Sequence, residues 1–249
     1  YLGAFLSFSK RRRRTRVQRT YGACKAVCER IQMLALPLEA RAVLAATAVI
    51  PKAMYACAAT PPSKKALGHL RALIAGTVWG QKNRWRANEV LFTLLCKGHL
   101  VDPVQVFGLQ TLIVNHRVLG RHPRLRAIFN NILRMRREDP RPHIGGPVKA
   151  LLQACDLANI ELEDDGAITW TDGDGNLFDD HLIDSDSGRV GHVFRDCLRR
   201  EQWEVLDLRR RGFEDIKGNV DRKDTMSLGR RLQGLERYRW RCVLTGAIP

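Results

Sequence analysis

Apolar residues recur at helical spacing along most of this chain, and that pattern constrains its fold more than any other feature. Val17, Tyr21, Cys24, Cys28 and Ile31 follow one another at intervals of four, three, four and three residues, which places them on one side of a helix. Comparable patterns cover residues 38–57, 64–79, 86–97, 103–120, 124–137, 148–160, 187–211 and 221–244. The sequence therefore predicts a mainly α protein.

Proline, glycine and a short polar turn interrupt this helical pattern. We expect the helix over 38–57 to bend at Pro51, because proline lacks a backbone donor and crowds the preceding turn. Tyr1–Leu6 has the apolar character of a short N-terminal β-strand, and Asp172–Gly175 lies between two extended segments, which predicts a small β-hairpin near 167–183. The Pro/Gly-rich stretch at 139–147 predicts a boundary between a region at 1–140 and a second at 148–249.

The two regions differ sharply in charge. Residues 1–150 hold 27 lysines and arginines against 6 acids, for a net charge of +21, whereas residues 151–249 hold 15 against 20, for −5. The segment 151–190 has 11 acids and one basic residue. Positive charge gathered in one region is typical of proteins that bind a polyanion such as nucleic acid.

The densest positive charge lies near the start of the chain. We call this stretch the arginine block, and it comprises Lys10, Arg11, Arg12, Arg13, Arg14, Arg16 and Arg19. A guanidinium group binds phosphate oxygens in pairs, so we expect the block to contact a nucleic-acid backbone. A solvated linker, a nuclear-localisation signal and a membrane-surface segment are the alternative interpretations of such a charge run.

A second candidate site places an aromatic ring among cations. Lys82, Arg84, Trp85 and Arg86 have the composition of a platform on which single-stranded bases stack, although Trp79 and Trp85 are also suited to packing in the core. Further cations either extend the basic surface or form a solvated helix face: Arg121, Arg124, Arg126, Arg134, Arg136 and Arg137.

The sequence predicts neither a catalytic nor a metal site. Asp172–Asn176 is similar to the start of a calcium loop, but the sixth and twelfth positions would be Leu177 and Ile183 in place of glycine and glutamate. The acid pairs at 164–165 and 179–180 lack the flanking strands of a polymerase metal site, so we expect solvent-facing loop acids.

The cysteines indicate a reducing, intracellular compartment. The chain has seven cysteines, which is an odd number. They are scattered through apolar helical segments without the spacing of a disulfide framework. Cys24 and Cys28 lie one helical turn apart on an apolar side, so we expect core packing rather than metal binding. No apolar run reaches the roughly 18 residues of a membrane span. Because the chain starts at Tyr1, without a methionine or a leader, we expect it to be a piece of a longer protein.

The order of several short motifs resembles the reverse transcriptase of non-LTR (LINE-like) retrotransposons, in the part downstream of the polymerase palm. Tyr1-Leu2-Gly3 is similar to the strand that closes the palm. The segments similar to the thumb and the region after it are the basic helix, the bent helix ending at Met54-Tyr55-Ala56, Ile74–Gly80, Arg86–Leu95, and Lys97-Gly98-His99 with Asp102-Pro103. Phe213-Glu214-Asp215-Ile216, Asp221-Arg222-Lys223 and Leu244-Thr245-Gly246 resemble the family's C-terminal region.

This resemblance implies a function for the intact protein. Residues 1–140 would be a basic, thumb-like, nucleic-acid-binding region, and 148–249 an acidic or mixed accessory region. The whole protein would be an RNA-directed DNA polymerase, with a nuclear location, that copies its element's RNA at a nicked DNA end. Its metal-binding aspartates would precede Tyr1, so no catalytic residue is carried over, and Mg²⁺ is implied only for the parent enzyme. The implied partners are an RNA template and a DNA primer, held through their backbones, without a membrane.

Three other interpretations remain open. The chain also fits a stand-alone basic helical RNA- or DNA-binding module without enzymatic activity. A peripheral membrane or partner-docking protein would use the arginine block against anionic lipid, although the block has no coherent apolar face beside it. A decayed element remnant would have no selected activity. The sequence does not indicate an oligomeric state or template specificity.

Overall fold

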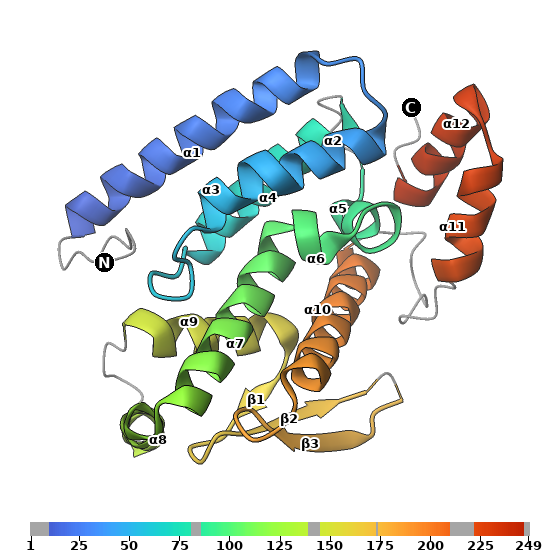
Figure 1. The fold of residues 1–249 in the computed structure, drawn as a ribbon. Helices are drawn as coiled ribbons and strands as arrows, with labels where there is room; N and C mark the ends of the chain where they lie inside the picture. The colour runs from blue at the N-terminus through green and yellow to red at the C-terminus, as the bar shows by residue number, and fades with distance from the viewer. Residues whose placement is uncertain (1–9, 81–85, 139–144, 173, 210–221, 247–249) are drawn as a thin grey trace. The chain divides into compact units, whose positions relative to one another are not determined.

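The structure, a computed structural model, describes residues 10–80, 86–138, 145–172, 174–209 and 222–246. For residues 10–17, 137 and 222 it describes the backbone alone. These ranges are mainly α-helical with a small antiparallel sheet, which confirms the predicted fold class (Figure 1). The strand predicted at Tyr1–Leu6 lies outside the described residues.

The chain divides into two compact units that interleave along the sequence. Unit 1 includes residues 54–63 and 107–201, whereas unit 2 includes 9–53, 64–106 and 202–249. This division differs from the boundary expected at 139–147, because packing joins segments that are distant in sequence. The roles assigned to regions 1–140 and 148–249 stay predictions.

Unit 2 begins with a long basic helix packed on shorter ones. α1 (Lys10–Met33) runs alongside α4 (Lys64–Trp79), and it also contacts α2 (Leu38–Leu44) and the π-helical segment η1 (Ala45–Val49) (Figure 1). Cys24, Cys28 and Ile31 are buried in this packing, as the helical spacing predicts.

The helix predicted over 38–57 is helical only to residue 54, where α3 (Ile50–Met54) ends. In place of a simple proline bend, the wider π turn η1 precedes Pro51, with the Ile50 N–H bonded to the Ala45 carbonyl. Proline would crowd the carbonyl four residues earlier, that of Thr47, and a π turn relieves this crowding by adding one residue to the turn. The strain is therefore absorbed before the proline.

The helix predicted over 86–97 is divided into shorter pieces. They are α5 (Asn88–Val90) and the π-helical η2 (Leu91–Leu95), and a further short helix, α6 (Gly98–Val101), follows. Gly98 allows this sharp change of direction, since a Cβ there would lie 2.3 Å from the Phe92 carbonyl oxygen.

A buried polar network within unit 2 centres on Asp102, directly before the start of α7 (Pro103–Arg121). Asp102 is fully buried and caps α7 by accepting the Val104 N–H at 3.1 Å. Its other oxygen lies 3.1 Å from Arg71 Nη2 and accepts a 2.9 Å bond from Gln202, on α10 (Ser187–Arg209). Burial raises the pKa of Asp102, and the charge of Arg71 opposes that shift.

The last two helices of unit 2 replace a single predicted one. The helix expected over 221–244 is broken into α11 (Arg222–Arg231) and α12 (Gly234–Thr245), and Gly234 has a φ of +50°. α12 is fixed to the start of α5, because the Ala87 N–H donates to the Thr245 carbonyl at 2.7 Å. A small core forms where Trp203 and Leu206 of α10 pack against the α5–η2 segment.

Unit 1 combines helices with the sheet. Its further helices are α8 (Pro123–Glu138) and α9 (Gly146–Ala158). The sheet order is β1 (Glu161–Leu162), β2 (Ala167–Thr171), β3 (Leu177–His181), with Thr169 opposite Asp179, so the predicted hairpin is confirmed. The largest fully buried side chains of this unit are Phe107, Leu112, Leu151, Ile168, Leu182, Phe194 and Leu198.

Candidate nucleic-acid interface

α1 has one buried and one exposed side. Cys24 and Cys28 are fully buried, and burial raises the pKa of Cys24 to about 11, so these thiols serve packing. Gln32 adds a polar link by donating to Thr77 Oγ1 on α4 at 3.4 Å. Arg19 and Arg30 are exposed. The seam therefore holds the helix in place while its opposite side presents positive charge to solvent.

The helix geometry divides the arginine block between sides. Consecutive positions on an α-helix are about 100° apart, so positions 11–14 are distributed around the axis of α1. Positions 12, 16 and 19 follow at intervals of four and three, and they share the side opposite the buried seam. Position 13 instead continues the line of 17, 21, 24 and 28. The seven positions of the block therefore do not share one side of the helix.

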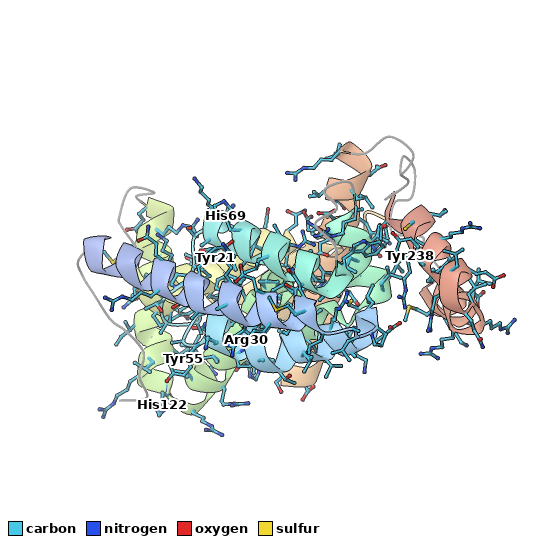
Figure 2. All side chains as sticks on the ribbon, turned by 90° about the horizontal axis from the view of Figure 1, so that it is seen from above. Tyr21, Arg30, Tyr55, His69, His122 and Tyr238 are labelled. Carbon is cyan, nitrogen blue, oxygen red and sulfur yellow. The ribbon has the colours of Figure 1, made fainter. Side chains whose placement is uncertain are left out.

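An aromatic residue and a histidine lie at the edge where α1 meets α4. The rings of Tyr21 and His69 are tilted by 59° with centroids 6.5 Å apart, and Figure 2 shows them next to one another on the two helices. Lys25 and Lys65, each one turn away, are exposed. We call Tyr21, Lys25, Lys65 and His69 the α1–α4 strip. Rings among cations offer stacking surface beside phosphate-binding charge.

The strip was not predicted as a site. The helical spacing predicts Tyr21 inside the seam, whereas its side chain is 37% exposed. His69 lies 48 positions further along the chain, so only tertiary packing brings the two rings together. The available signal was an aromatic residue at the margin of a helical stripe, close to lysines and arginines.

The second predicted cluster is only partly described. Lys82, Arg84 and Trp85 lie outside the described residues. Arg86 is only 8% exposed, and its guanidinium lies 3.6 Å from where a Cβ on Gly76 would be. Burial lowers the pKa of Arg86. Arg86 thus lacks the exposed position that a phosphate contact needs, because the chain at 86–87 is held against α12.

Unit 1 has its own positive charge along α7 and α8. The exposed arginines there include Arg117, Arg121, Arg124, Arg134 and Arg136. Arg126 is paired with Asp184 at 3.1 Å, and the side chain of Arg137 is not described. Leu125, Ile128 and Met135 are also exposed, so α8 presents both apolar and cationic groups to solvent.

The two acids of the pair at 179–180 have different environments. Asp179 is exposed, as expected, but the Asp180 side chain is only 11% exposed, so the prediction of a solvent-facing loop acid is wrong for it. It lies on β3 and accepts bonds from the Ser185 hydroxyl and the His181 N–H, with Arg189 Nε 3.0 Å away. Burial opposes ionisation of Asp180, but these donors outweigh it and the pKa is lowered. Asp180 thus fixes the end of the hairpin.

The Asp172 loop is closed by its own residues. Asp172 Oδ1 accepts the N–H groups of Asp174 and Asn176, both at 2.9 Å. Within the described ranges no group of three or more His, Cys, Asp or Glu side chains is arranged to hold a metal ion. All seven cysteines lie in those ranges, and they are buried with free thiols.

No protein-family model, curated protein or solved structure matches this chain. Among the helices of the described ranges, none combines the length and the apolar character needed to cross a bilayer.

Proposed function

We propose that this chain is the nucleic-acid-gripping part of a reverse transcriptase of a non-LTR retrotransposon. It holds an RNA template and a DNA primer through their phosphates. The motif order along the sequence supports the family, and the exposed outer side of α1 with the adjoining α1–α4 strip supports the grip. The observation that carries the proposal is this combination: a basic helix, docked by an apolar seam, with Tyr21 and His69 at its edge.

The chain itself contributes binding and no chemistry in this proposal. The aspartates that hold Mg²⁺ belong to the upstream part of the parent polymerase, which acts in the nucleus. The arginines and lysines of α1 neutralise phosphates, and the Tyr21 ring offers a face to an unpaired base. Since such contacts are to the backbone and to base faces, they are tolerant of sequence. Nucleotide incorporation by this chain alone would contradict the proposal.

Salt dependence tests the grip. A labelled RNA–DNA template–primer is titrated with the chain by fluorescence anisotropy at several KCl concentrations. Each neutralised phosphate contributes about −0.9 to the slope of log affinity against log salt, so the double variant Arg19→Ala/Arg30→Ala flattens the slope by about 1.8. Arg239→Ala on α12 is the matched control, because that arginine is also exposed and lies on a different helix. An affinity insensitive to salt refutes the grip.

The alternative, a stand-alone basic RNA- or DNA-binding module, predicts the same slope. The polymerase proposal and the stand-alone module differ in what they predict for the sequence encoded upstream of Tyr1. The polymerase proposal requires paired aspartates in an apolar hairpin there, and a reading frame that lacks them favours the stand-alone module.

A membrane-surface function has one observation in its favour. Leu125, Ile128 and Met135 recur at helical spacing on α8 and are 43%, 55% and 60% exposed, with Arg124 and Arg136 nearby in sequence. Basic amphipathic helices of this kind bind anionic lipid. Flotation with phosphatidylserine vesicles, abolished by Ile128→Glu, would favour that function over the polymerase proposal.

A further inference from the structure

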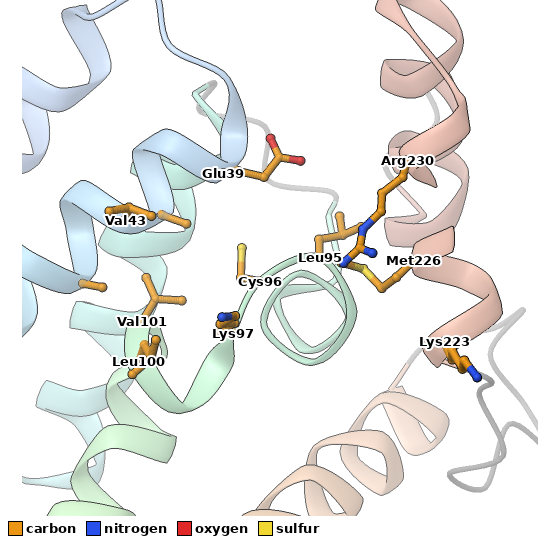
Figure 3. Close-up of a pocket in the computed structure, with 12 residues that line it drawn as sticks. Glu39, Val43, Leu95, Cys96, Lys97, Leu100, Val101, Lys223, Met226 and Arg230 are labelled. Atoms are coloured by element: carbon orange, nitrogen blue, oxygen red, sulfur yellow. The ribbon is translucent and has the colours of Figure 1, made fainter. Parts of the chain in front are cut away.

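A cavity of about 630 Å³ opens on the surface of unit 2, between α2, the η2–α6 connection and α11 (Figure 3). We call it the groove. Its walls are apolar. Ala42, Val43 and Ala46 form one wall, and Leu100 and Met226 belong to the walls formed by α6 and α11. This volume and lining are typical of a binding site.

The groove exposes apolar surface to water. Val43 is 61% exposed and Leu100 is 48% exposed, although both line it. Ala42 on α2 and Ala46 on η1 are four residues apart, and their small side chains leave room for a close approach to these two segments. Cys96 closes the inner end at 6% exposure. Such a concave apolar surface gains free energy when a complementary apolar face covers it.

The rim is positively charged. Lys97, Lys223 and Arg230 line the groove, and they form no ion pair with any described residue. Glu39 also lines it, but its carboxylate is already paired with Arg241. The rim thus has unneutralised cations above an apolar floor, which is complementary to an apolar surface with acids at its border.

The spacing of these cations selects among possible occupants. Lys223 and Arg230 are seven residues apart on α11, which is two turns, or about 10 Å along the helix axis. One anionic head group on an alkyl chain would reach only one of them, whereas acids two turns apart on a helix lying along α11 reach both. A stacked base would need an aromatic wall, and the residues that line the groove include none.

The wall formed by α11 is held in place by contacts within unit 2. A Cβ at Gly229 would lie 2.4 Å from the Trp240 ring, so glycine lets α12 approach α11 closely. Arg237 Nε also donates to the Gly229 carbonyl at 2.9 Å. Because this side of α11 packs on α12, the side with Lys223, Met226 and Arg230 is left to line the groove.

We propose that the groove binds an acidic amphipathic helix of a partner protein. The partner's apolar residues, at helical spacing, enter the groove beside Val43 and Leu100. Its acids, about two turns apart, pair with Lys223 and Arg230. This is helix-in-groove recognition, and it is independent of the nucleic-acid grip on α1.

The test starts from a displayed library of 14-residue helices, with randomised apolar and charged positions, selected on the full chain. We expect enriched peptides to carry apolar residues at helical spacing and acids about two turns apart. An enriched peptide is then synthesised with a fluorescent label, and its affinity is measured by anisotropy. A library that yields no peptide, or only peptides without acids, overturns the proposal.

Matched variants then locate the binding. Arg230→Glu should weaken the peptide's affinity at least about tenfold, whereas Arg231→Glu, next to it on α11 but outside the groove, should change it less than about twofold. Leu100→Gln should weaken it similarly, against Leu228→Gln, which is 51% exposed and does not line the groove.

Two further measurements separate this proposal from its rivals. Peptide binding that is equal in Arg230→Glu and Arg231→Glu places the peptide elsewhere and overturns the proposal. Displacement of the peptide by sodium dodecanoate at one equivalent also overturns it, because the groove would then be a site for single-headed amphiphiles. Template–primer affinity, measured on the same variants, should stay the same, so failure here is distinguishable from failure of the grip on α1.

Discussion

Replacing Ile31 by alanine should loosen α1 without changing any charge. Ile31 is 5% exposed and, with Cys24 and Cys28, it forms the buried seam that holds α1 on its neighbours. Loss of a buried isoleucine costs about 3 kcal/mol, since apolar area is lost and a cavity remains. Met33, two residues further on the same helix and 84% exposed, is the matched control, and Met33→Ala should change stability by less than about 0.5 kcal/mol.

The expected effect is local as well as global. If α1 opens by itself, a loss of about 3 kcal/mol of stability raises the population of the open state about a hundredfold. Amide hydrogen exchange in α1 should then accelerate by the same factor. Urea denaturation gives the global change. Template–primer affinity should then fall in Ile31→Ala, because the cations of α1 are no longer held beside the α1–α4 strip.

Two results would refute this reasoning at different points. Equal exchange rates for α1 in Ile31→Ala and Met33→Ala would show that the seam does not dock the helix. Faster exchange with an unchanged template–primer affinity would leave the packing argument intact and remove the functional role of α1.

Three further predictions concern the fold and its titrating groups. In urea titrations, Gly98→Ala should lower the free energy of unfolding by more than about 2 kcal/mol, because the new Cβ would lie 2.3 Å from a backbone oxygen. Gly120→Ala, in open space on a helix, should instead raise the free energy of unfolding by roughly 0.5 kcal/mol. Burial raises the pKa of Cys96 and Cys155 to about 12, so both thiols stay protonated at pH 8. They should react with a disulfide reagent only as fast as the chain opens. Rapid labelling of the native chain would contradict their burial. Because the pKa of Asp180 is lowered on folding, its stabilising contribution is present above the ordinary aspartate value and is lost as pH falls through the folded value; the difference in stability between the wild type and Asp180→Asn should therefore shrink in acid, and a difference that grew would refute this.

Local patterns in the sequence predicted the long elements. The spacing of Leu67, Leu70, Ile74 and Val78 predicts α4, and these four side chains are buried. The helical pattern over 103–120 predicts α7, and its start at Pro103 is fixed by a local bond from the Val104 N–H to Asp102. The hairpin follows from turn residues between extended segments in the same way.

What the sequence could not predict depends on contacts between distant residues. Gln202 reaches Asp102 across 100 positions, and no local spacing encodes that bond. The burial of Arg86 follows from packing around the residue, although its neighbours in sequence suggest a surface cluster. The groove was missed for the same reason, because α2 and α11 form its walls only when the chain is folded. The π turns at 45–49 and 91–95 were missed because the apolar periodicity around them still fits an ordinary helix.

The position of the arginine block on α1 has a consequence for the helix itself. A helix macrodipole puts about half a positive charge at its N-terminus, and α1 adds cations there with no acid in its first turn. The cations in the first turns of α1 thus repel one another and the positive end of the helix dipole. Added salt screens that repulsion, which favours the free helix, while it also competes with phosphates for the same groups. Ionic strength should therefore move helix stability and polyanion affinity in opposite directions.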